Sequence, residues 1–201
     1  KNFVVTGSFN ANYDFKKKFN FQKNLKNIKK NNICVVVLSP GICEETLCHE
    51  KKLVEITKSI SDIKNVEVFF RRKPAEEDLK YKNFYKNSFS NYQNIHITSN
   101  EINLNEFLDI GDIFITSISS SAMDLLSRGA KVYFIDFMKT PTFYLPWEKF
   151  PKLVLNEKNA FKVIKSWIKN ENADNLRKIH YYECLKMRKY VGEINNNFKK
   201  Y

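Results

Sequence analysis

The chain has 201 residues, which is enough for one domain with a substantial buried core. Its 34 lysines and arginines against 22 aspartates and glutamates give a net charge of +12, which favours an anionic partner but does not choose among nucleic acid, acidic lipid and nucleotide. No apolar run approaches the about 20 residues of a membrane-spanning helix, and no signal peptide is evident, so we expect a soluble, cytoplasmic protein. The four cysteines have neither disulfide nor zinc spacing, which predicts reduced thiols and no metal site.

The first third of the chain alternates apolar and polar segments. Residues 1–30 begin with a short strand and continue as a lysine- and asparagine-rich segment, which we interpret as a crossing strand and linker from an upstream domain. Ile33–Leu38 is the most continuous apolar run and predicts a buried strand, closed by the turn residues Pro40 and Gly41. Glu44–Ile60 carries apolar residues at helical spacing with acidic residues at its start, which predicts an amphipathic helix.

The middle of the chain repeats this alternation. Val66–Phe70 predicts another strand, which ends in the basic turn Arg71–Pro74. After a helix rich in lysine and tyrosine, Ile95–Ile97 predicts a short strand, followed by the loop Thr98–Asn103 and a helical turn that reaches Leu108.

A strand, helix and strand are predicted between Gly111 and Asp136. Ile113–Thr116 and Val132–Ile135 are short apolar runs typical of strands buried on both faces, and the helix between them is expected to stop at Gly129.

Serines crowd the turn into this helix, from Ser117 to Ser121. Their hydroxyls and the unpaired N–H groups of the first helical turn form an end that can hold a phosphate. The alternative is that they only cap the helix, with Ser121 and Asp124 as a capping box. Both interpretations remain open on the sequence alone.

The last part of the chain is irregular and aromatic up to Lys152, and Leu153–Leu155 predicts an edge strand. Phe161 to Ile168 predicts an amphipathic helix, and a last helix from about Asp174 to Val191 carries many cations. Its basic face is either a contact to acidic lipids or simply a solvated surface.

Strands that alternate with helices in this way predict an α/β fold: a Rossmann-like parallel sheet with helices on both faces. We expect this domain to span residues 31–170, with residues 171–201 as a C-terminal basic helix that packs back on it. In such sheets the ligand crevice lies beyond the carboxyl ends of the strands, where the polar turns cluster. We see no internal repeat.

Three segments resemble one family, the C-terminal nucleotide-sugar-binding domain of GT-B glycosyltransferases. They are similar in particular to bacterial surface-polysaccharide transferases of the sialyltransferase-like, Kdo-transferase-like and glycerophosphotransferase-like kinds. Val5-Thr6-Gly7 with Asp14 matches the segment that crosses into the second domain, and Lys73-Pro74-Ala75-Glu76 occupies the place of an H-P-x-E turn. Asp112 to Gly129 matches the signature D-I-x-I-T-x-x-S-S-x-x-x-(D/E)-x-x-x-x-G, and it is the most specific of the three.

The resemblance implies one half of a GT-B fold that binds a CMP-, CDP- or UDP-activated sugar or polyol phosphate for transfer to a surface glycan. Ser119, Ser120 and Ser121 would bind the donor phosphates, and Asp124 would bind the ribose unless it belongs to a capping box. Arg72 and Lys73 would act as electrostatic helpers, unless they are only a solvated strand end. The candidate donor-binding residues are Pro40, Gly41, Arg72, Lys73, Pro74, Thr98, Glu101, Ser117, Ser119, Ser120, Ser121 and Asp124.

The resemblance implies neither a metal nor a cofactor, and it leaves the catalytic residue unknown, because it places the general base and the acceptor pocket in an upstream domain. The family's histidine is replaced by Lys73, which keeps a positive charge but does not exchange protons near neutral pH. An inactive domain therefore remains an alternative. We expect His49, His96 and His180 to be structural or exposed rather than catalytic.

A second class of function is a non-catalytic nucleotide- or RNA-binding α/β module, suggested by the positive charge and by aromatic residues interleaved with lysines at Tyr81–Tyr92. We expect that run to pack a helix on the sheet instead, so nucleic acid is not the expected partner.

Overall fold

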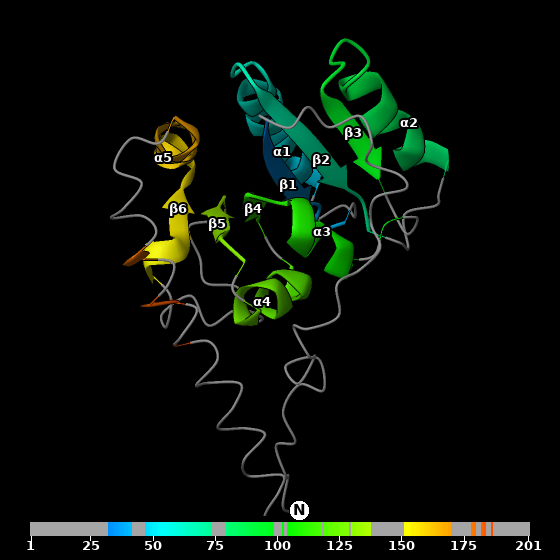
Figure 1. Cartoon of the computed structure of the whole chain (residues 1–201). Coiled ribbons are helices and arrows are strands. Elements are labelled where there is room, and N and C mark those ends of the chain that lie inside the picture. Colours follow the sequence, from blue (N-terminus) through cyan, green and yellow to red (C-terminus); the bar gives the residue numbers. More distant parts are fainter. Residues whose placement is uncertain are drawn as a thin grey trace, which may run out of the picture.

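The computed structural model describes residues 32–41, 47–73, 79–98, 102, 104–117, 119–128, 130–137, 151–169, 178–179, 182–183 and 186. Within these ranges strands and helices alternate along the chain, as expected for an α/β protein (Figure 1).

Six strands and five helices are described, together with one short 3-10 turn. The strands are β1 (Ile33–Leu38), β2 (Val66–Arg71), β3 (Ile95–Thr98), β4 (Ile113–Thr116), β5 (Val132–Asp136) and β6 (Val154–Asn156). The helices are α1 (Leu47–Ser61), α2 (Leu79–Ser88), α3 (Leu104–Ile110), α4 (Ser120–Ser127) and α5 (Glu157–Ile168), and the 3-10 turn η4 (Pro151–Leu153) leads into β6. Every strand expected between Ile33 and Leu155 is present, with bounds that differ by at most one residue.

The six strands form one parallel sheet in the order β3-β2-β1-β4-β5-β6. The chain first builds outward from β1 to β3 and then returns to place β4 on the other side of β1. In that pair Val35 lies opposite Ile113 and Leu38 opposite Thr116. This strand order is the Rossmann arrangement, and it confirms the predicted fold class.

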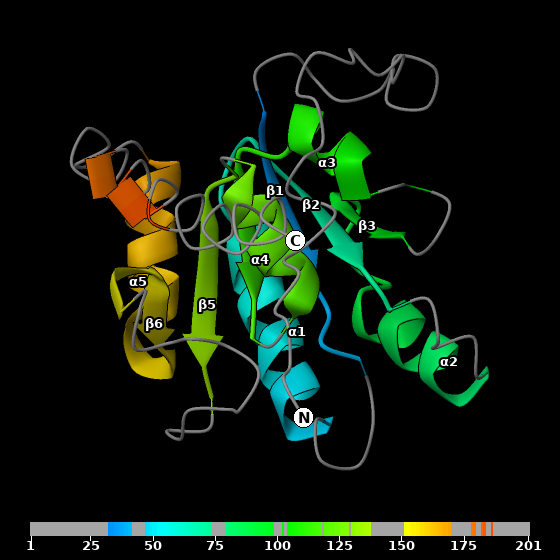
Figure 2. The ribbon, with the colours of Figure 1, turned by 90° about the horizontal axis from the view of Figure 1, so that it is seen from below.

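Helices cover both faces of the sheet, because each central strand is apolar on both sides. Val35 and Val37 of β1 belong to a core shared with α1, α2 and α5. Val36 and Leu38 point to the opposite core, which α3 and α4 cover. In Figure 2 α4 lies in front of the strands and α1 behind them.

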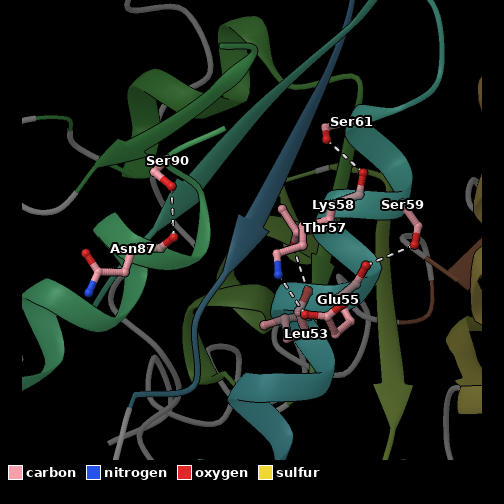
Figure 3. Close-up of polar contacts among 8 residues, drawn as sticks. All are labelled: Leu53, Glu55, Thr57, Lys58, Ser59, Ser61, Asn87 and Ser90. Carbon is pink, nitrogen blue, oxygen red and sulfur yellow. Dashed lines mark hydrogen bonds and ion pairs between the residues drawn. The ribbon is translucent and has the colours of Figure 1, made fainter. Parts of the chain in front are cut away.

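Hydroxyls within α1 and after α2 are satisfied locally (Figure 3). Thr57 donates to the Leu53 carbonyl at 2.7 Å and Ser61 donates to the Lys58 carbonyl at 2.7 Å. Ser59 and Ser90 make the same kind of contact to carbonyls three or four residues earlier. Each of these four hydroxyls therefore has a backbone acceptor within its own helix or turn and needs no ligand to satisfy it.

Asp112, the first residue of the signature, joins β4 to β1 at the amino edge of the sheet. Its Oδ2 accepts a hydrogen bond from the Cys34 N–H at 2.9 Å, and its own N–H donates to the Cys34 carbonyl at 2.9 Å. The Cys34 thiol is buried there, and burial, with Asp112 and Glu67 nearby, raises its pKa to about 12. Asp112 therefore has a structural role, and Cys34 stays protonated at neutral pH.

Several expectations lie outside the described residues, among them the crossing strand at 1–30 and most of the last helix. Among the described residues of that helix, Glu183 is buried and Tyr182 is 63% exposed. Lys186 Nζ donates to both carboxylate oxygens of Glu183 at 3.2 Å. None of the described helices combines the length and the apolar character needed to cross a membrane.

We predict that Gly111→Ala destabilises the protein, because the turn between α3 and β4 leaves no room for a Cβ atom. A Cβ at this position would lie 2.5 Å from Cζ of buried Phe114 and 2.9 Å from the Phe107 carbonyl oxygen. We expect the free energy of unfolding, measured by urea denaturation, to fall by about 1–3 kcal/mol. Asp109→Ala, an exposed change on α3, is the control and should shift it by less than about 0.5 kcal/mol. Equal stabilities of the two variants would contradict the packing described here.

Candidate functional site

The site lies at the carboxyl edge of the sheet, where the strand order reverses between β1 and β4. The turn after β1 leads to α1 on one face, and the turn after β4 leads to α4 on the other face. The point where two such loops diverge is the usual ligand position in open α/β sheets. Pro40 and Gly41 follow β1, and Ser117 and Ser119 follow β4, so these four residues lie at that point of the strand order.

The turn after β1 is held from within by a buried carboxylate. Ser39 Oγ donates to Glu50 Oε1 at 2.5 Å, and the Gly41 N–H donates to Ser39 Oγ at 3.0 Å and to the same carboxylate oxygen at 3.3 Å. The Tyr85 hydroxyl, 3.1 Å from Ser39 Oγ, then completes the cluster as a donor. Gly41 has φ 97°, a conformation that favours glycine.

Pro40 and Gly41 are therefore a rigid, buried wall of the crevice, and the Gly41 N–H is directed at Glu50 and Ser39. Glu50 was not among the residues predicted for the site. The sequence shows it only as an acidic residue near the start of an amphipathic helix, yet its side chain is fully buried.

The turn after β4 carries Ser117 and Ser119 to the start of α4. Ser117 is 1% exposed, and its Oγ has no hydrogen-bond partner among the described residues. Ser119 is the N-cap residue of α4, with φ −157° and ψ 125°, but its side chain makes no capping hydrogen bond. Ser121 and Asp124 are both half-buried within α4.

The alternative that Ser121 and Asp124 form a capping box is wrong, because Ser121 is not the N-cap residue. The helix begins at Ser120, so its N-cap is Ser119, and Ser121 already lies within the first turn. The side chain of Ser120 lies outside the described residues. The helix ends at Ser127 as expected, although Gly129 itself is not described.

The basic corner after β2 lies on the same edge of the sheet. The Arg72 N–H donates to the Thr98 carbonyl at 2.8 Å, which ties the corner to the end of β3. Arg72 Nε and Thr98 Oγ1 are both buried, and in the described part of the chain neither has a hydrogen-bond partner. Lys73 is exposed, whereas Pro74 and Glu101 lie outside the described residues.

The strand order places Arg72 and Thr98 at different distances from Ser117 along the edge of the sheet. Neighbouring strands are about 4.8 Å apart, so Arg72 lies about 10 Å from Ser117 along the edge and Thr98 about 14 Å. The turns after β1 and β4 are brought together, but Thr98 is not brought to the serines. Only an elongated ligand could contact Ser117 and Thr98 at once.

His49 lies within α1, the helix in which the sequence placed it. Expected to be structural or exposed, it is 4% exposed, and its ring lies edge-on to Phe137 with centroids 5.8 Å apart. Its Nδ1 has no hydrogen-bond partner among the residues described. Burial, and then the charge of Lys52, lower its pKa, while Asp136 and Glu157 act in the opposite direction. The imidazole is therefore neutral at pH 7.

The other histidines do not reach this edge. His96 lies near the amino end of β3, where its Nε2 is 2.9 Å from Glu67 Oε2 and its side chain is 44% exposed. His180 lies outside the described residues.

Four buried polar atoms without a partner thus line one edge of the sheet: His49 Nδ1, Arg72 Nε, Thr98 Oγ1 and Ser117 Oγ. Buried polar groups are almost always hydrogen-bonded, and leaving one unsatisfied costs about 1–3 kcal/mol. At the carboxyl edge these atoms could bind a polar ligand or ordered water, although Trp167 Nε1 of α5 is also buried without a partner among the described residues. Within the described residues, no three histidine, cysteine or carboxylate side chains are placed to hold a metal ion.

The chain was compared with proteins of known sequence and structure. No protein-family model matches it, and no curated protein matches it in sequence. Among solved structures, the wall teichoic acid polymerase TagF has 17% identity and a TM-score of 0.60, covering 88% of this chain and 42% of that one. MnaA of S. aureus with UDP has 12% identity and a TM-score of 0.59, covering 92% and 48%. The spinosyn rhamnosyltransferase SpnG with spinosyn aglycone has 12% identity and a TM-score of 0.54, covering 85% and 44%.

These neighbours have the GT-B fold, and the chain spans less than half of the length of each. The chain therefore has the Rossmann-like parallel sheet of one half of these GT-B neighbours, which confirms the fold class expected from the sequence. Identities of this size show the fold alone, so the chemistry must be argued from the site.

We predict that Ser117→Ala stabilises the protein, because it removes a buried hydroxyl that has no partner. The free energy of unfolding, measured by urea denaturation without ligand, should rise by about 1 kcal/mol. Thr116→Val is the matched control: the adjacent, fully buried Thr116 hydroxyl donates to the Leu38 carbonyl at 2.9 Å. Its loss should lower the same quantity by about 1 kcal/mol. If both variants were destabilised equally, the Ser117 hydroxyl would have a partner within the protein.

Proposed function

We propose that this chain is the donor-binding, C-terminal half of a GT-B glycosyltransferase that transfers a sugar or polyol phosphate from a CMP-, CDP- or UDP-activated donor to a bacterial surface glycan. The observation that carries the proposal is the buried, unpartnered Ser117 hydroxyl beside the uncapped start of α4, at the reversal between β1 and β4.

The donor phosphate binds at the start of α4. The first turn of a helix has N–H groups without intrahelical acceptors, and the helix dipole adds positive potential there. Ser117 adds a buried hydroxyl without a partner among the described residues, and Ser119 adds a hydroxyl that makes no capping bond. Phosphate oxygens can accept hydrogen bonds from both kinds of donor, so the diphosphate is held largely without charged side chains. Ser120 and Ser121, in the same turn, complete the phosphate site.

Arg72 and Lys73 supply the positive charge. Negative charge develops on the nucleotide as it leaves, and a fixed cation nearby stabilises that transition state. The basic corner lies about 10 Å along the edge from Ser117, so its long side chains would have to extend toward β1 and β4 to offset the charge on the phosphates. Lys73 would contact a phosphate as a point charge. With cations and N–H groups in place, the transfer needs no metal, and the general base belongs to the upstream domain.

The remaining donor contacts extend in both directions from the phosphate. Asp124 lies one turn into α4, where its half-buried carboxylate can accept hydrogen bonds from the ribose hydroxyls. Thr98 ends β3 at the far end of the edge and would contact the base, together with Glu101, which comes three residues later in the sequence.

The fold neighbours support the nucleotide-sugar proposal. TagF is named as a polymerase and SpnG as a rhamnosyltransferase, and MnaA is seen with UDP. The basic C-terminal segment would hold the enzyme at the inner face of the membrane, in the cytoplasm, where surface glycans are assembled.

The nucleic-acid alternative has less support. A single-strand binding surface needs exposed aromatic rings for base stacking. In the run of aromatic residues around α2, Tyr85 and Phe89 are buried, and Phe84 and Tyr92 pack against the core. As expected, these rings attach the helix to the sheet, so they are not available to stack on bases.

We predict that the chain binds one of CMP, CDP and UDP in a saturable way, measured by isothermal titration calorimetry at 50 and 200 mM salt. The double variant Ser119→Ala, Ser121→Ala should weaken that binding at least about tenfold, or about 1.4 kcal/mol, because it removes phosphate donors. Because Ser119 makes no capping bond, the variant should remain folded. Ser59→Ala, whose hydroxyl bonds within α1, is the control and should bind as the wild type does.

Single-stranded RNA is titrated in parallel. Steep loss of RNA affinity between the two salt concentrations, without preference for any nucleotide, would favour the nucleic-acid module and contradict the transferase.

A further inference from the structure

His49 and Ser117 lie at the same edge of the sheet, although they are far apart in the sequence. Helix α1 leaves the end of β1, and the His49 ring contacts Phe137, which directly follows β5. Because β4 lies between β1 and β5, that contact crosses the carboxyl end of β4, where Ser117 begins the turn.

Ser117 directly follows β4, and we infer from the alternation along that strand that it lies on the same face as His49. Ile113 and Ile115 point into the core that α1 and α5 cover, and Phe137 belongs to that core. Phe114 points to the opposite core. Side chains alternate along a strand, so position 117 continues the face of Ile113 and Ile115.

Both residues are buried, and neither Ser117 Oγ nor His49 Nδ1 has a hydrogen-bond partner in the part of the chain that the structure describes. They do not bond to each other, so each needs a third group. We propose that one phosphoryl group of the nucleotide binds between Ser117 Oγ and His49 Nδ1, which makes His49 an additional ligand-binding residue; this inference rests on the proposed function.

Charged groups around His49 determine its protonation. Lys52 lies one turn further along α1, with its Nζ 5.7 Å from the Phe137 ring and 2.8 Å from Glu157 Oε2. Asp136 ends β5, Glu157 begins α5, and the buried Glu50 is the next residue of α1. Burial and Lys52 together lower the pKa of His49, so the free protein holds a neutral ring.

A phosphoryl group next to the ring favours the imidazolium form and so raises the pKa of His49 above its value in the free protein. Binding then takes up a proton from solvent. The contribution of His49 to affinity grows as the pH falls through the pKa of the complex, and it stops growing below the pKa of the free protein.

The test uses His49→Phe, which keeps a ring against Phe137 and removes both nitrogens. We expect the midpoint of thermal unfolding to stay the same or rise, because a buried polar atom without a partner is lost. We expect affinity for CDP or UDP, whichever the wild type binds more tightly, to fall at least about tenfold at pH 6, with a smaller loss at pH 8. His96→Phe is the matched control, because His96 is exposed at the amino edge and should leave affinity unchanged.

A second measurement follows the imidazole itself. In ¹⁵N-labelled protein, the ring signals assigned to His49 by their loss in His49→Phe should move from neutral to protonated positions when the nucleotide is added at pH 7. If the wild type binds nucleotide, but His49→Phe binds equally well and the ring signals do not move, His49 contacts ordered water only and this inference is wrong. If the wild type binds none of the nucleotides, the proposed function itself fails.

Discussion

The parallel pairing of β1 with β4 is the constraint on which the rest of the structure depends. Asp112 ties the two strands at the amino edge, and Thr116 ties them at the carboxyl edge through the Leu38 carbonyl. This pairing reverses the strand order, so α1 and α4 leave toward opposite faces and their starting turns diverge. A crevice at this point follows from topology before any side chain is considered.

Hydrogen bonding differs between the helices and the carboxyl edge. Within α1, Thr57 and Ser61 donate to carbonyls of their own helix, and at the turn after β1 the buried Glu50 accepts from Ser39 and Gly41. At the carboxyl edge, polar atoms are buried without such partners. A protein gains stability by satisfying these groups, so leaving them unsatisfied is understandable where a ligand completes the bonds. This contrast, rather than the net charge, is what supports a binding site.

Much of the fold follows from local pattern, because short apolar runs such as Ile113–Thr116 can only be strands buried on both faces. The site is harder to predict. Helical spacing shows which face of α1 is buried, but it does not show that Glu50 and His49 on that face lie at the carboxyl edge of the sheet. That depends on strand order, which places β5 and its Phe137 near α1. The sequence also cannot choose the cap among consecutive serines, each with a similar preference, and only the backbone assigns it to Ser119.

The central claim is that the unpartnered groups between β1 and β4 exist to hold a nucleotide phosphate. A crystal structure of the protein soaked with CDP or UDP tests it most directly. We predict diphosphate density at the start of α4, with a phosphoryl oxygen within hydrogen-bond distance of Ser117 Oγ and the Ser119 hydroxyl. Nucleotide density elsewhere on the molecule, with ordered water bound to Ser117 Oγ in its place, would contradict the account.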